Sequence, residues 1–534
     1  MAPDYHGSNL PQMEIDFLIE MENLIQQSPI PKVEVLEQTI VSNGASIVER
    51  NIGFTIHKNR ITGLGFSTQK LIVLPPSLGA LSELRELYLL NNKLVSLPAS
   101  LGRLTKLEKL ILGNNRISSL PNSIISLKNL TELDLKSNRM QYLPELFGNL
   151  QKLKSLSLYN NQLSSFPDSI GELRDLEILE LSNNELTALP DSIGLLRSLK
   201  QLDLSYNNIR RLPNSLTNLG KLEEFNISWN ILEEIPPNFG NLSHLKICYL
   251  FNNKLDTLPE TISKLKNLQV LNLSWNKLGE LPEQFGDLNS LEALNIVNNR
   301  LTLLAESFGK LKSLKYLNLR RNHLSNLPDS FGKLKNLQHL EISWNALETL
   351  PGTFSNLINL VHLDLSYNQI IRIPNEITKI KELKRLNLQS NKLSYLPEFI
   401  GLLSELRLFN VSYNLLNSLP ESMSALKMLK AVDLQGNPWD EGYEQIVDQT
   451  VTEIIDYFER ISQFTKNSDS DQIPYKDLYQ ISDTVAKIVS SKWFTQFLKT
   501  NFAQVEQIYH KLQAGQISEK EFFLQLNSLH KKQE

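Results

Sequence analysis

The chain has 534 residues, 41% of them apolar, and a net charge of −4, which is ordinary for a globular protein and gives no reason to expect nucleic acid as a partner. Cys248 is the only cysteine, so no disulfide can form within the chain, as is typical of a reducing compartment. We see neither a signal peptide at the start of the sequence nor an apolar run long enough to span a membrane, and we expect a cytoplasmic location.

Two elements are predicted near the start of the chain. Residues 13–27 place Phe17, Leu18 and Met21 on one side of a helical pattern, which predicts a short amphipathic helix. Residues 52–66 predict two strands around a turn at Lys58 and Asn59. We expect this hairpin to cover the exposed edge of whatever sheet follows it.

Asparagine recurs every 23 residues from Asn92 to Asn437, sixteen times without an insertion. Around each one lies the pattern LxxLxLxxNxLxxLPxxxGxLxx, as in the segment that begins at Leu84. A shorter unit from Leu64 to Pro75 carries Gln69 in place of the asparagine, and we interpret it as a capping half-repeat. This periodicity predicts an α/β leucine-rich-repeat solenoid, a right-handed horseshoe with a concave parallel β-sheet.

Each position of the repeat has a physical reason. The LxL pair, such as Leu87 and Leu89, alternates with period two and predicts a short strand. The asparagine both donates and accepts hydrogen bonds, so it can satisfy backbone groups in a buried turn. A proline such as Pro98 fixes φ where the chain leaves the strand, and a glycine such as Gly102 is expected to allow a tight bend. The return segments are short and led by proline, so we expect 3₁₀ turns on the convex side.

After Asn437 the period stops and helical patterns follow. Residues 443–464 carry apolar side chains at alternating four- and three-residue spacing, which predicts an amphipathic helix that caps the last repeat. The expected organisation is a helix and capping hairpin over 1–60, the solenoid over 61–440, a capping helix over 441–465 and a helical region over 473–534.

The 23-residue LPxxxGxL repeat resembles the intracellular leucine-rich-repeat class that includes Ras-binding scaffold and Ras-suppressor proteins and their plant relatives. The hairpin that leads straight into the repeats is similar to leucine-rich-repeat proteins of prokaryotes, notably archaea. The segment 508–526 (IYHKLQAGQISEKEFFLQL) is similar to the short SHOCT helical hairpin. The main resemblance implies a scaffold or regulator whose concave face holds a protein, often a small GTPase or a phosphatase subunit.

Strand residues between the core leucines are expected to point onto the concave sheet, together with the residues just before each asparagine. Several of these positions are apolar or aromatic, and exposed aromatic side chains are common anchors of protein interfaces. The alternative is that the tryptophans and tyrosines before the asparagines only stack on one another from turn to turn. The predicted partner-binding residues of this kind are Ile247, Tyr249, Phe251, Val270, Ala293, Trp229, Trp275, Tyr316, His339, Trp344 and His362.

Charge is also distributed unevenly along the predicted concave face. The N-terminal half carries carboxylates that could steer a basic patch of a partner, although a merely solvated face would show the same pattern. The C-terminal half is more basic, with Arg320, Arg321, Lys384, Arg385 and Arg407. The acidic residues that we predict as partner contacts are Glu132, Asp134, Glu180 and Asp203.

Catalytic patterns are weak in this sequence. There is no GxxxxGK[ST] segment, so the chain does not look like a GTPase itself. His339 and His362 fall at equivalent positions of adjacent repeats, about 5 Å apart, and could form a metal site, but stacking alone puts any two like residues in register. Cys248 occupies a core strand position, as a small buried hydrophobe would.

We therefore predict a protein-binding scaffold or regulator in intracellular signalling, with no enzymatic activity, no cofactor and no resident metal. Its expected partner is a folded protein, such as a small GTPase or a phosphatase subunit, and not a nucleic acid. The alternative is a structural or assembly protein whose helical C-terminal tail mediates association. A third alternative is a metal-dependent hydrolase that uses the two histidines.

Overall fold

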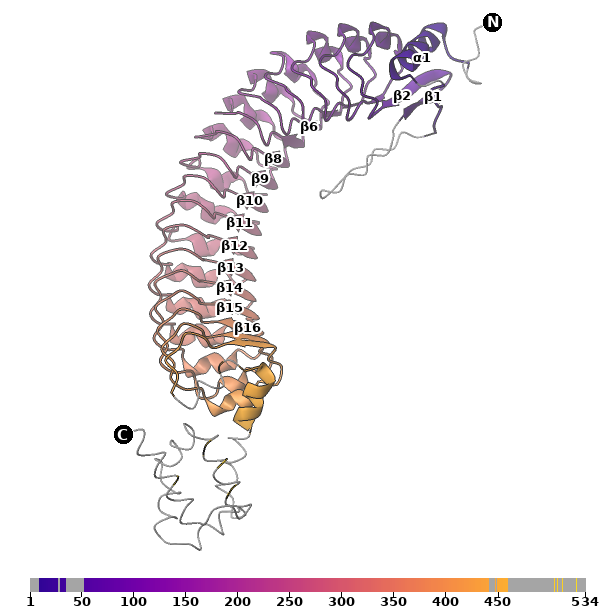
Figure 1. Cartoon of the computed structure of the whole chain (residues 1–534). Coiled ribbons are helices and arrows are strands. Elements are labelled where there is room, and N and C mark those ends of the chain that lie inside the picture. Colours follow the sequence, from indigo (N-terminus) through magenta and orange to yellow (C-terminus); the bar gives the residue numbers. More distant parts are fainter. Residues whose placement is uncertain are drawn as a thin grey trace. The chain divides into compact units, whose positions relative to one another are not determined.

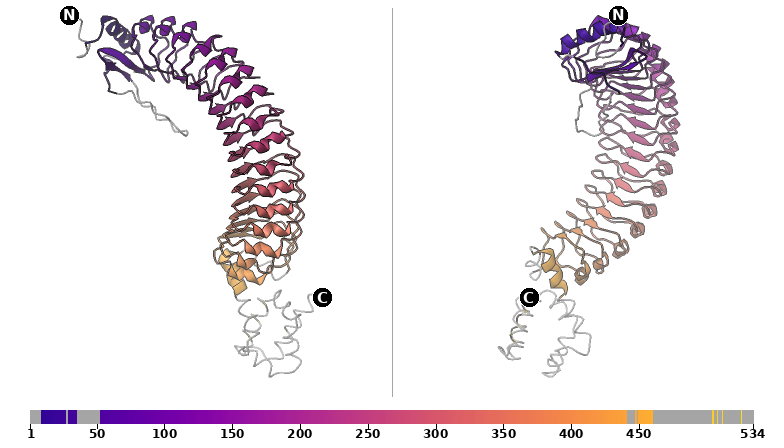
Figure 2. Two further views of the ribbon diagram at one scale, coloured as in Figure 1. Left: turned by 180° about the vertical axis from the view of Figure 1, so that it is seen from behind. Right: turned by 90° about the vertical axis from the view of Figure 1, so that its right-hand side faces the viewer.

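The computed structural model describes residues 9–26, 29–34, 52–440, 447, 449–459, 504, 507, 511 and 525. The chain divides into two compact units, Met1–Leu291 and Glu292–Glu534, and each is described by itself. Within each unit, short strands lie along one side and 3₁₀ turns along the other (Figures 1 and 2).

The first unit begins with helix α1 (Gln12–Ile25) and an antiparallel hairpin of β1 (Ile52–His57) and β2 (Arg60–Phe66), as the sequence predicts. Lys58 and Asn59 both have positive φ, which is the backbone of a type I′ hairpin turn. On its other side β2 pairs in parallel with β3 (Glu86–Tyr88), so the hairpin does cover the edge of the first repeat.

A buried ion pair fastens α1 to the hairpin. The Glu14 side chain is 1% exposed, and its Oε1 accepts a hydrogen bond from Arg60 Nε at 2.5 Å. Its Oε2 accepts a second from the backbone N–H of Ile61 at 2.9 Å. The helix is therefore held to β2 by a carboxylate whose two oxygens are both occupied.

Every later strand has three residues and pairs in parallel with the next strand of its unit, with a leucine or similar apolar residue at its centre. In the first unit these strands are β3, β4 (Lys109–Ile111), β5 (Glu132–Asp134), β6 (Ser155–Ser157), β7 (Ile178–Glu180), β8 (Gln201–Asp203), β9 (Glu224–Asn226), β10 (Ile247–Tyr249) and β11 (Val270–Asn272). In the second unit they are β12 (Ala293–Asn295), β13 (Tyr316–Asn318), β14 (His339–Glu341), β15 (His362–Asp364), β16 (Arg385–Asn387), β17 (Leu408–Asn410) and β18 (Ala431–Asp433).

The return segments are 3₁₀ helices of three or five residues, which confirms the expectation of short turns. Most begin after a proline, such as Pro98 at φ −68°, whose ring holds that angle. In the first unit they are η1 (Pro76–Ala80), η2 (Ala99–Arg103), η3 (Asn122–Ser126), η4 (Phe147–Asn149), η5 (Asp168–Glu172), η6 (Asp191–Leu195), η7 (Asn214–Asn218), η8 (Phe239–Asn241), η9 (Glu260–Lys264) and η10 (Phe285–Asp287). In the second they are η11 (Glu306–Lys310), η12 (Asp329–Lys333), η13 (Gly352–Asn356), η14 (Asn375–Lys379), η15 (Ile400–Leu402) and η16 (Glu421–Ala425).

The core of each unit lies between its strands and its 3₁₀ turns. Strand-centre leucines such as Leu87 and Leu110 are fully buried, and Cys248 takes this place in β10. Burial raises the pKa of the Cys248 thiol, which therefore stays protonated and inert. In the second unit the rings of Phe308 and Phe331 stack from turn to turn at 6.2 Å.

The repeated asparagine joins neighbouring repeats through backbone hydrogen bonds. Asn184 Nδ2 donates to Leu158 O at 2.9 Å and to Leu181 O at 3.0 Å, while its Oδ1 accepts from Leu163 N at 3.0 Å. Two of these three groups belong to the preceding repeat. The side chain thus satisfies buried backbone groups on both sides of a repeat boundary, as its chemistry predicts.

The reason for the repeated glycine differs from the one predicted. Neither Gly102 nor Gly148 has a positive φ, so neither provides a special bend. A Cβ on Gly148 would lie only 2.0 Å from the carbonyl oxygen of Ser169 in the following repeat, and the corresponding distance at Gly102 is 2.5 Å, to Ser123. Glycine is needed there because the next turn passes so close.

Turn length explains where that glycine is replaced. Six repeats carry a larger residue at the same position. Four of these residues precede a repeat with a three-residue 3₁₀ turn: Ile125 before η4, Thr217 before η8, Ser263 before η10 and Thr378 before η15. Ser355, before the five-residue η14, is the exception, and Ser424 lies in η16, the last of the 3₁₀ turns described.

A helix over residues 451–459 follows the last repeat in the second unit, with Ile454 and Phe458 buried as predicted. The sequence placed its start near residue 443, but Val447 lies in a turn. The helix begins after Thr450, because Thr450 and Glu453 form a reciprocal capping box, with Thr450 N donating to Glu453 Oε2 at 2.8 Å. The predicted helices beyond 473 and the SHOCT-like segment 508–526 lie outside the described residues, apart from single positions.

Candidate functional site

The first and third residues of each strand point away from the core and form what we call the open face of the sheet. The residues directly before each strand, such as Arg85 and Glu108, form its border, which we call the pre-strand row. The residues directly before each asparagine, such as Trp229, form the opposite border, which we call the rim. These three groups contain all the binding residues that the sequence predicts except Phe251, which lies two residues after the end of β10.

The apolar part of the open face in the first unit centres on β10. Ile247 and Tyr249 are half-buried, and the Tyr249 ring meets Phe251 edge-on with centroids 6.4 Å apart. Val270 on β11 pairs in register with Ile247. Ile247, Tyr249 and Val270 thus lie on two adjacent strands of one sheet, with Phe251 just beyond the end of β10, where a partner could contact them together.

The rim residues adopt the left-handed backbone conformation in repeat after repeat. Trp229, Trp275 and Trp344 have φ of 55°, 57° and 59°, a region that bulky residues rarely enter. In early repeats the same position is asparagine, and Asn183 Nδ2 donates to Asn160 Oδ1 at 2.7 Å. A tryptophan or tyrosine at this position cannot form the hydrogen bond that links these asparagines from repeat to repeat.

The predicted stacking of rim aromatics is present in both units. In the first, Trp229 stacks on Tyr206 with centroids 5.2 Å apart and an interplanar angle of 9°. In the second, Trp344 stacks on Tyr367 at 4.2 Å and 12°, with the Arg321 guanidinium 5.7 Å from the Trp344 ring centroid. The stacked rings of Trp229 and Trp344 are still 47% and 44% exposed, and Trp275 is 51% exposed, so these indoles remain available to a partner.

The four predicted acidic residues lie on β5, β7 and β8 of the first unit, and most have contacts within the chain. Asp134 is buried; its Oδ1 accepts from Lys136 N at 2.9 Å and its Oδ2 lies 3.1 Å from Lys136 Nζ. Glu180 accepts a hydrogen bond from Ser157 Oγ at 2.7 Å, and Asp203 Oδ1 accepts from Ser205 N at 2.9 Å.

The position of Asp134 and Asp203 is an Asx turn that ends the strand. Asn226 and Asn410 do the same in other repeats, with Oδ1 accepting from the N–H two residues on at 3.1 and 2.9 Å. Burial raises the pKa of Asp134, and the charge of Lys136 opposes that shift. The shared role of these aspartates and asparagines is therefore to end the strand with an Asx turn.

The two histidines of the second unit do come together. His339 and His362 pair in register on β14 and β15, and their Nδ1 atoms are 2.9 Å apart. Burial, then the charges of His339, Arg385 and Lys384, lower the pKa of His362. Tyr316 on β13 lies beside His339 with ring centroids 6.3 Å apart, and Ala293 on β12 pairs with Tyr316. In the part of the chain that the structure describes, no group of three or more metal-ligating side chains is found.

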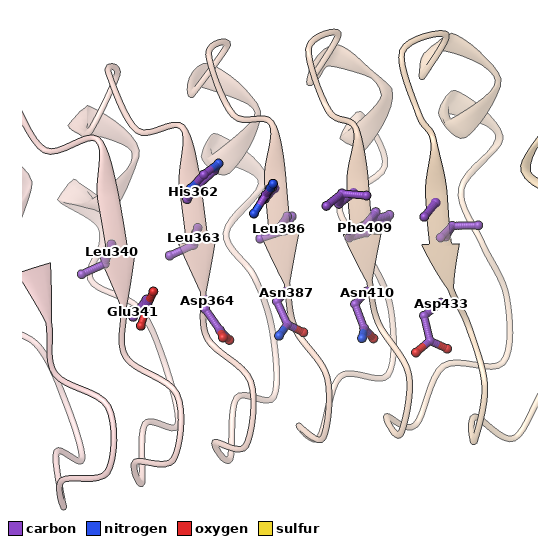
Figure 3. Close-up of a pocket in the computed structure, with 14 residues that line it drawn as sticks. Leu340, Glu341, His362, Leu363, Asp364, Leu386, Asn387, Phe409, Asn410 and Asp433 are labelled. Atoms are coloured by element: carbon purple, nitrogen blue, oxygen red, sulfur yellow. The ribbon is translucent and has the colours of Figure 1, made fainter. Parts of the chain in front are cut away.

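A depression of about 430 Å³ lies on the open face of the second unit, over β14 to β18. Figure 3 shows Glu341, Asp364, Asn387, Asn410 and Asp433 in line, one from each successive strand. His362, Arg385, Leu408 and Ala431 line the depression from the first position of their strands. Sequence analysis missed Leu408 and the two asparagines here, although comparing residues 23 apart would have placed them beside His362 and Asp364.

Comparison with known families identifies the repeat. The family described as leucine-rich repeat region matches residues 74–166, 145–235, 236–314 and 302–391. The chain belongs to the leucine-rich-repeat family. No curated protein matches the chain.

Solved leucine-rich-repeat structures resemble this leucine-rich-repeat protein over most of its length. A leucine-rich-repeat protein of Leptospira interrogans is 35% identical, with 70% of this chain and 95% of that chain covered and a TM-score of 0.60. The plant peptide hormone receptor RGFR1, solved in complex with RGF2, is 29% identical, with 73% and 69% covered and a TM-score of 0.59. YopM from Yersinia enterocolitica is 27% identical, with 70% and 78% covered and a TM-score of 0.50.

These relatives show that the chain has the fold of a leucine-rich-repeat solenoid. Among the described residues of this leucine-rich-repeat protein, no helix has the length and apolar character needed to cross a bilayer.

Proposed function

We propose that this protein is a non-catalytic scaffold or regulator that binds a folded protein partner on the open face of its sheet. The observation that carries this proposal is a set of aromatic side chains on or beside the open face and at its rim that stay at least partly exposed although they fill no core. In the first unit Trp229 and Trp275 are exposed and Tyr249 and Phe251 are half-buried; in the second Trp344 is exposed and Tyr316 is half-buried. Large aromatic anchors with few rotamers contribute strongly to protein interfaces.

The resemblance of the 23-residue repeat to Ras-binding and Ras-suppressor proteins makes a small GTPase the first partner class to test, and a phosphatase subunit the second. The receptor RGFR1, of the same family, was solved with RGF2 bound, which supports polypeptide recognition by this fold. The buried, free Cys248 fits a cytoplasmic location. In this proposal the chain holds its partner and does no chemistry on it.

The test is affinity capture with crosslinking and mass spectrometry from the native cell, using the full chain and Tyr249→Ala plus Phe251→Ala. The double variant should lose the captured partner. Tyr142→Ala plus Leu146→Ala is the matched control, because both side chains are exposed but lie on the return segment. Equal capture by all three proteins would contradict the proposal.

The alternative is an assembly protein whose helical tail mediates association. A chain that ends at residue 465 separates the two possibilities. Under our proposal it keeps the partner, whereas under the alternative it loses self-association, which light scattering would detect.

A further inference from the structure

Three cations stand side by side in the pre-strand row of the second unit. Arg407 N donates to Lys384 O at 2.8 Å, and Lys430 N donates to Arg407 O at 2.8 Å, so the three residues occupy adjacent strands in register. Arg385, the first residue of β16, is exposed next to Lys384. Four positive charges therefore gather at the border of β16, β17 and β18.

Earlier in the same row, opposite charges pair across strands. Arg85 meets Glu108 at 2.5 Å, Glu177 meets Lys200 at 2.6 Å, Glu223 meets Lys246 at 2.7 Å, and Glu292 meets Lys315 at 2.7 Å. Like charges on adjacent strand positions destabilise a sheet. The row therefore departs from its own rule over the last three repeats.

The four cations are not neutralised within the described part of the chain. Among those residues, Lys384, Arg385, Arg407 and Lys430 form no ion pair, and the buried Nε of Arg407 has no hydrogen-bond partner. The lowered pKa of His362, to which Arg385 and Lys384 contribute, agrees with an excess of positive charge here. A bound anion would relieve the repulsion.

An apolar surface lies directly beside these cations. Leu408 is 37% exposed and Ala431 is also exposed, and both line the 430 Å³ depression next to Arg385. Asn387 and Asn410 offer amide groups farther along the same strands, as Figure 3 shows. A ligand that fits this surface carries negative charge on one side and an apolar group on the other, and can also accept hydrogen bonds.

We propose that β16 to β18 bind an extended acidic segment of the protein partner, whose aspartate or glutamate carboxylates pair with Lys384, Arg407 and Lys430. An apolar side chain of the same segment rests on Leu408 and Ala431. This inference rests on the proposed function, because it names the chemistry of the partner that the open face holds. Arginine suits such a site because its planar guanidinium meets a carboxylate with two parallel hydrogen bonds.

The probe is a short fluorescein-labelled peptide in which glutamates alternate with leucines, and anisotropy measures its binding to the full chain. The variant Lys384→Glu, Arg407→Glu, Lys430→Glu should weaken binding at least about tenfold. The control Lys312→Glu, Lys333→Glu, Lys335→Glu changes net charge equally on exposed lysines outside the open face and should bind as the native chain does. A peptide with lysines in place of the glutamates should not bind.

Several outcomes would overturn the inference: equal loss in both triple variants, unchanged binding in the first, or equal binding of the lysine peptide. Tighter binding of a single-stranded oligonucleotide than of the glutamate peptide would point to nucleic acid instead. If the acidic peptide fails while Tyr249→Ala plus Phe251→Ala still abolishes partner capture, the proposed function stands and only this inference is wrong. Circular dichroism of each variant checks that it is folded.

Discussion

Two stretches of the pre-strand row use charge in opposite ways. Up to Lys315, acidic and basic residues of the row pair across strands, as Glu223 and Lys246 do in the first unit and Glu292 and Lys315 in the second. In the last three repeats of the second unit, Lys384, Arg407 and Lys430 form no such pair among the described residues. Counting charges along the sequence does not reveal this difference, because the acidic face of the first unit is largely occupied by its own partners. Unneutralised charge therefore marks a candidate contact better than abundant charge does.

The largest effect that would test this comparison is at Glu14, the most buried of the paired carboxylates. Glu14→Ala leaves the Arg60 guanidinium and the Ile61 N–H without their acceptor. We expect the free energy of unfolding of the first unit to fall by about 3 to 5 kcal/mol, as for other buried ion pairs with one partner removed. Urea denaturation followed by circular dichroism measures it. Glu20→Ala, on the exposed side of α1, is the control, and an equal loss there would contradict the assignment.

Asn184→Ala in the first unit tests a contact between repeats that involves no charge. The change leaves Leu158 O, Leu181 O and Leu163 N without their shared partner. A loss of at least about 2 kcal/mol in unfolding free energy is expected, because buried backbone groups lose their hydrogen bonds. Asn208→Ala, at an exposed position one repeat later, should leave the denaturation midpoint unchanged. Similar midpoints for the two variants would show that the ladder contributes little.

Arg407→Glu sharpens the comparison because it should stabilise the protein. The change places a carboxylate between Lys384 and Lys430 and restores the alternation seen in earlier repeats. We expect a gain of about 0.2 to 1 kcal/mol, the range for opposite charges on adjacent strands. Lys246→Glu, which sets a glutamate against Glu223, should lower the melting temperature instead. A lower melting temperature for Arg407→Glu would refute the repulsion on which the proposed site depends.

The smallest effect is expected at Asp134, and it depends on pH. Burial raises the pKa of this carboxyl, and Glu180 adds to the shift while Lys136 opposes it. A raised folded-state pKa means that ionised Asp134 destabilises the fold, so its cost appears as pH rises through that pKa and vanishes in acid. Asp134→Asn keeps the Oδ1 acceptor and should change stability by less than about 0.5 kcal/mol at neutral pH, towards greater stability. Melting temperatures from acid to neutral pH should converge at the acid end, and divergence there would contradict this account.

Much of the fold follows from the sequence because the repeat makes it one-dimensional. The asparagine period gives the strands, their register and the buried hydrogen-bond ladder, and the Lys58-Asn59 turn gives the hairpin. The ion pair between Glu14 and Arg60 could not be found this way, since 46 residues separate its partners and the period does not relate them. The start of the helix over 451–459 was available from Thr450 and Glu453, whose spacing is that of a capping box.

The candidate site was less predictable from the sequence. Whether a side chain on the sheet is available to a partner depends on its burial and on the hydrogen bonds and ion pairs that it forms within the chain. The sequence places Asp134 and Asp203 on the sheet face correctly, but it does not show that their Oδ1 atoms end their strands. Stacking of the rim aromatics was the alternative to partner binding, and Trp229 does stack on Tyr206 and Trp344 on Tyr367, yet the left-handed backbone of both tryptophans is not visible in the residue type. These details depend on φ angles and on neighbours one repeat away.

The glycine that meets the next repeat at Gly148 has a consequence for how such a chain can grow. Which residue fits at this position depends on the length of the 3₁₀ turn in the next repeat. Each repeat therefore constrains the composition of the repeat before it, and not of the one after it. A single repeat copied into a new place could set a threonine or isoleucine at this position against a five-residue turn in the next repeat. It could equally set a glycine there against a three-residue turn, where glycine is not needed. Duplication in this lineage should therefore preserve pairs of consecutive repeats, and designers who splice such solenoids should cut them in pairs as well.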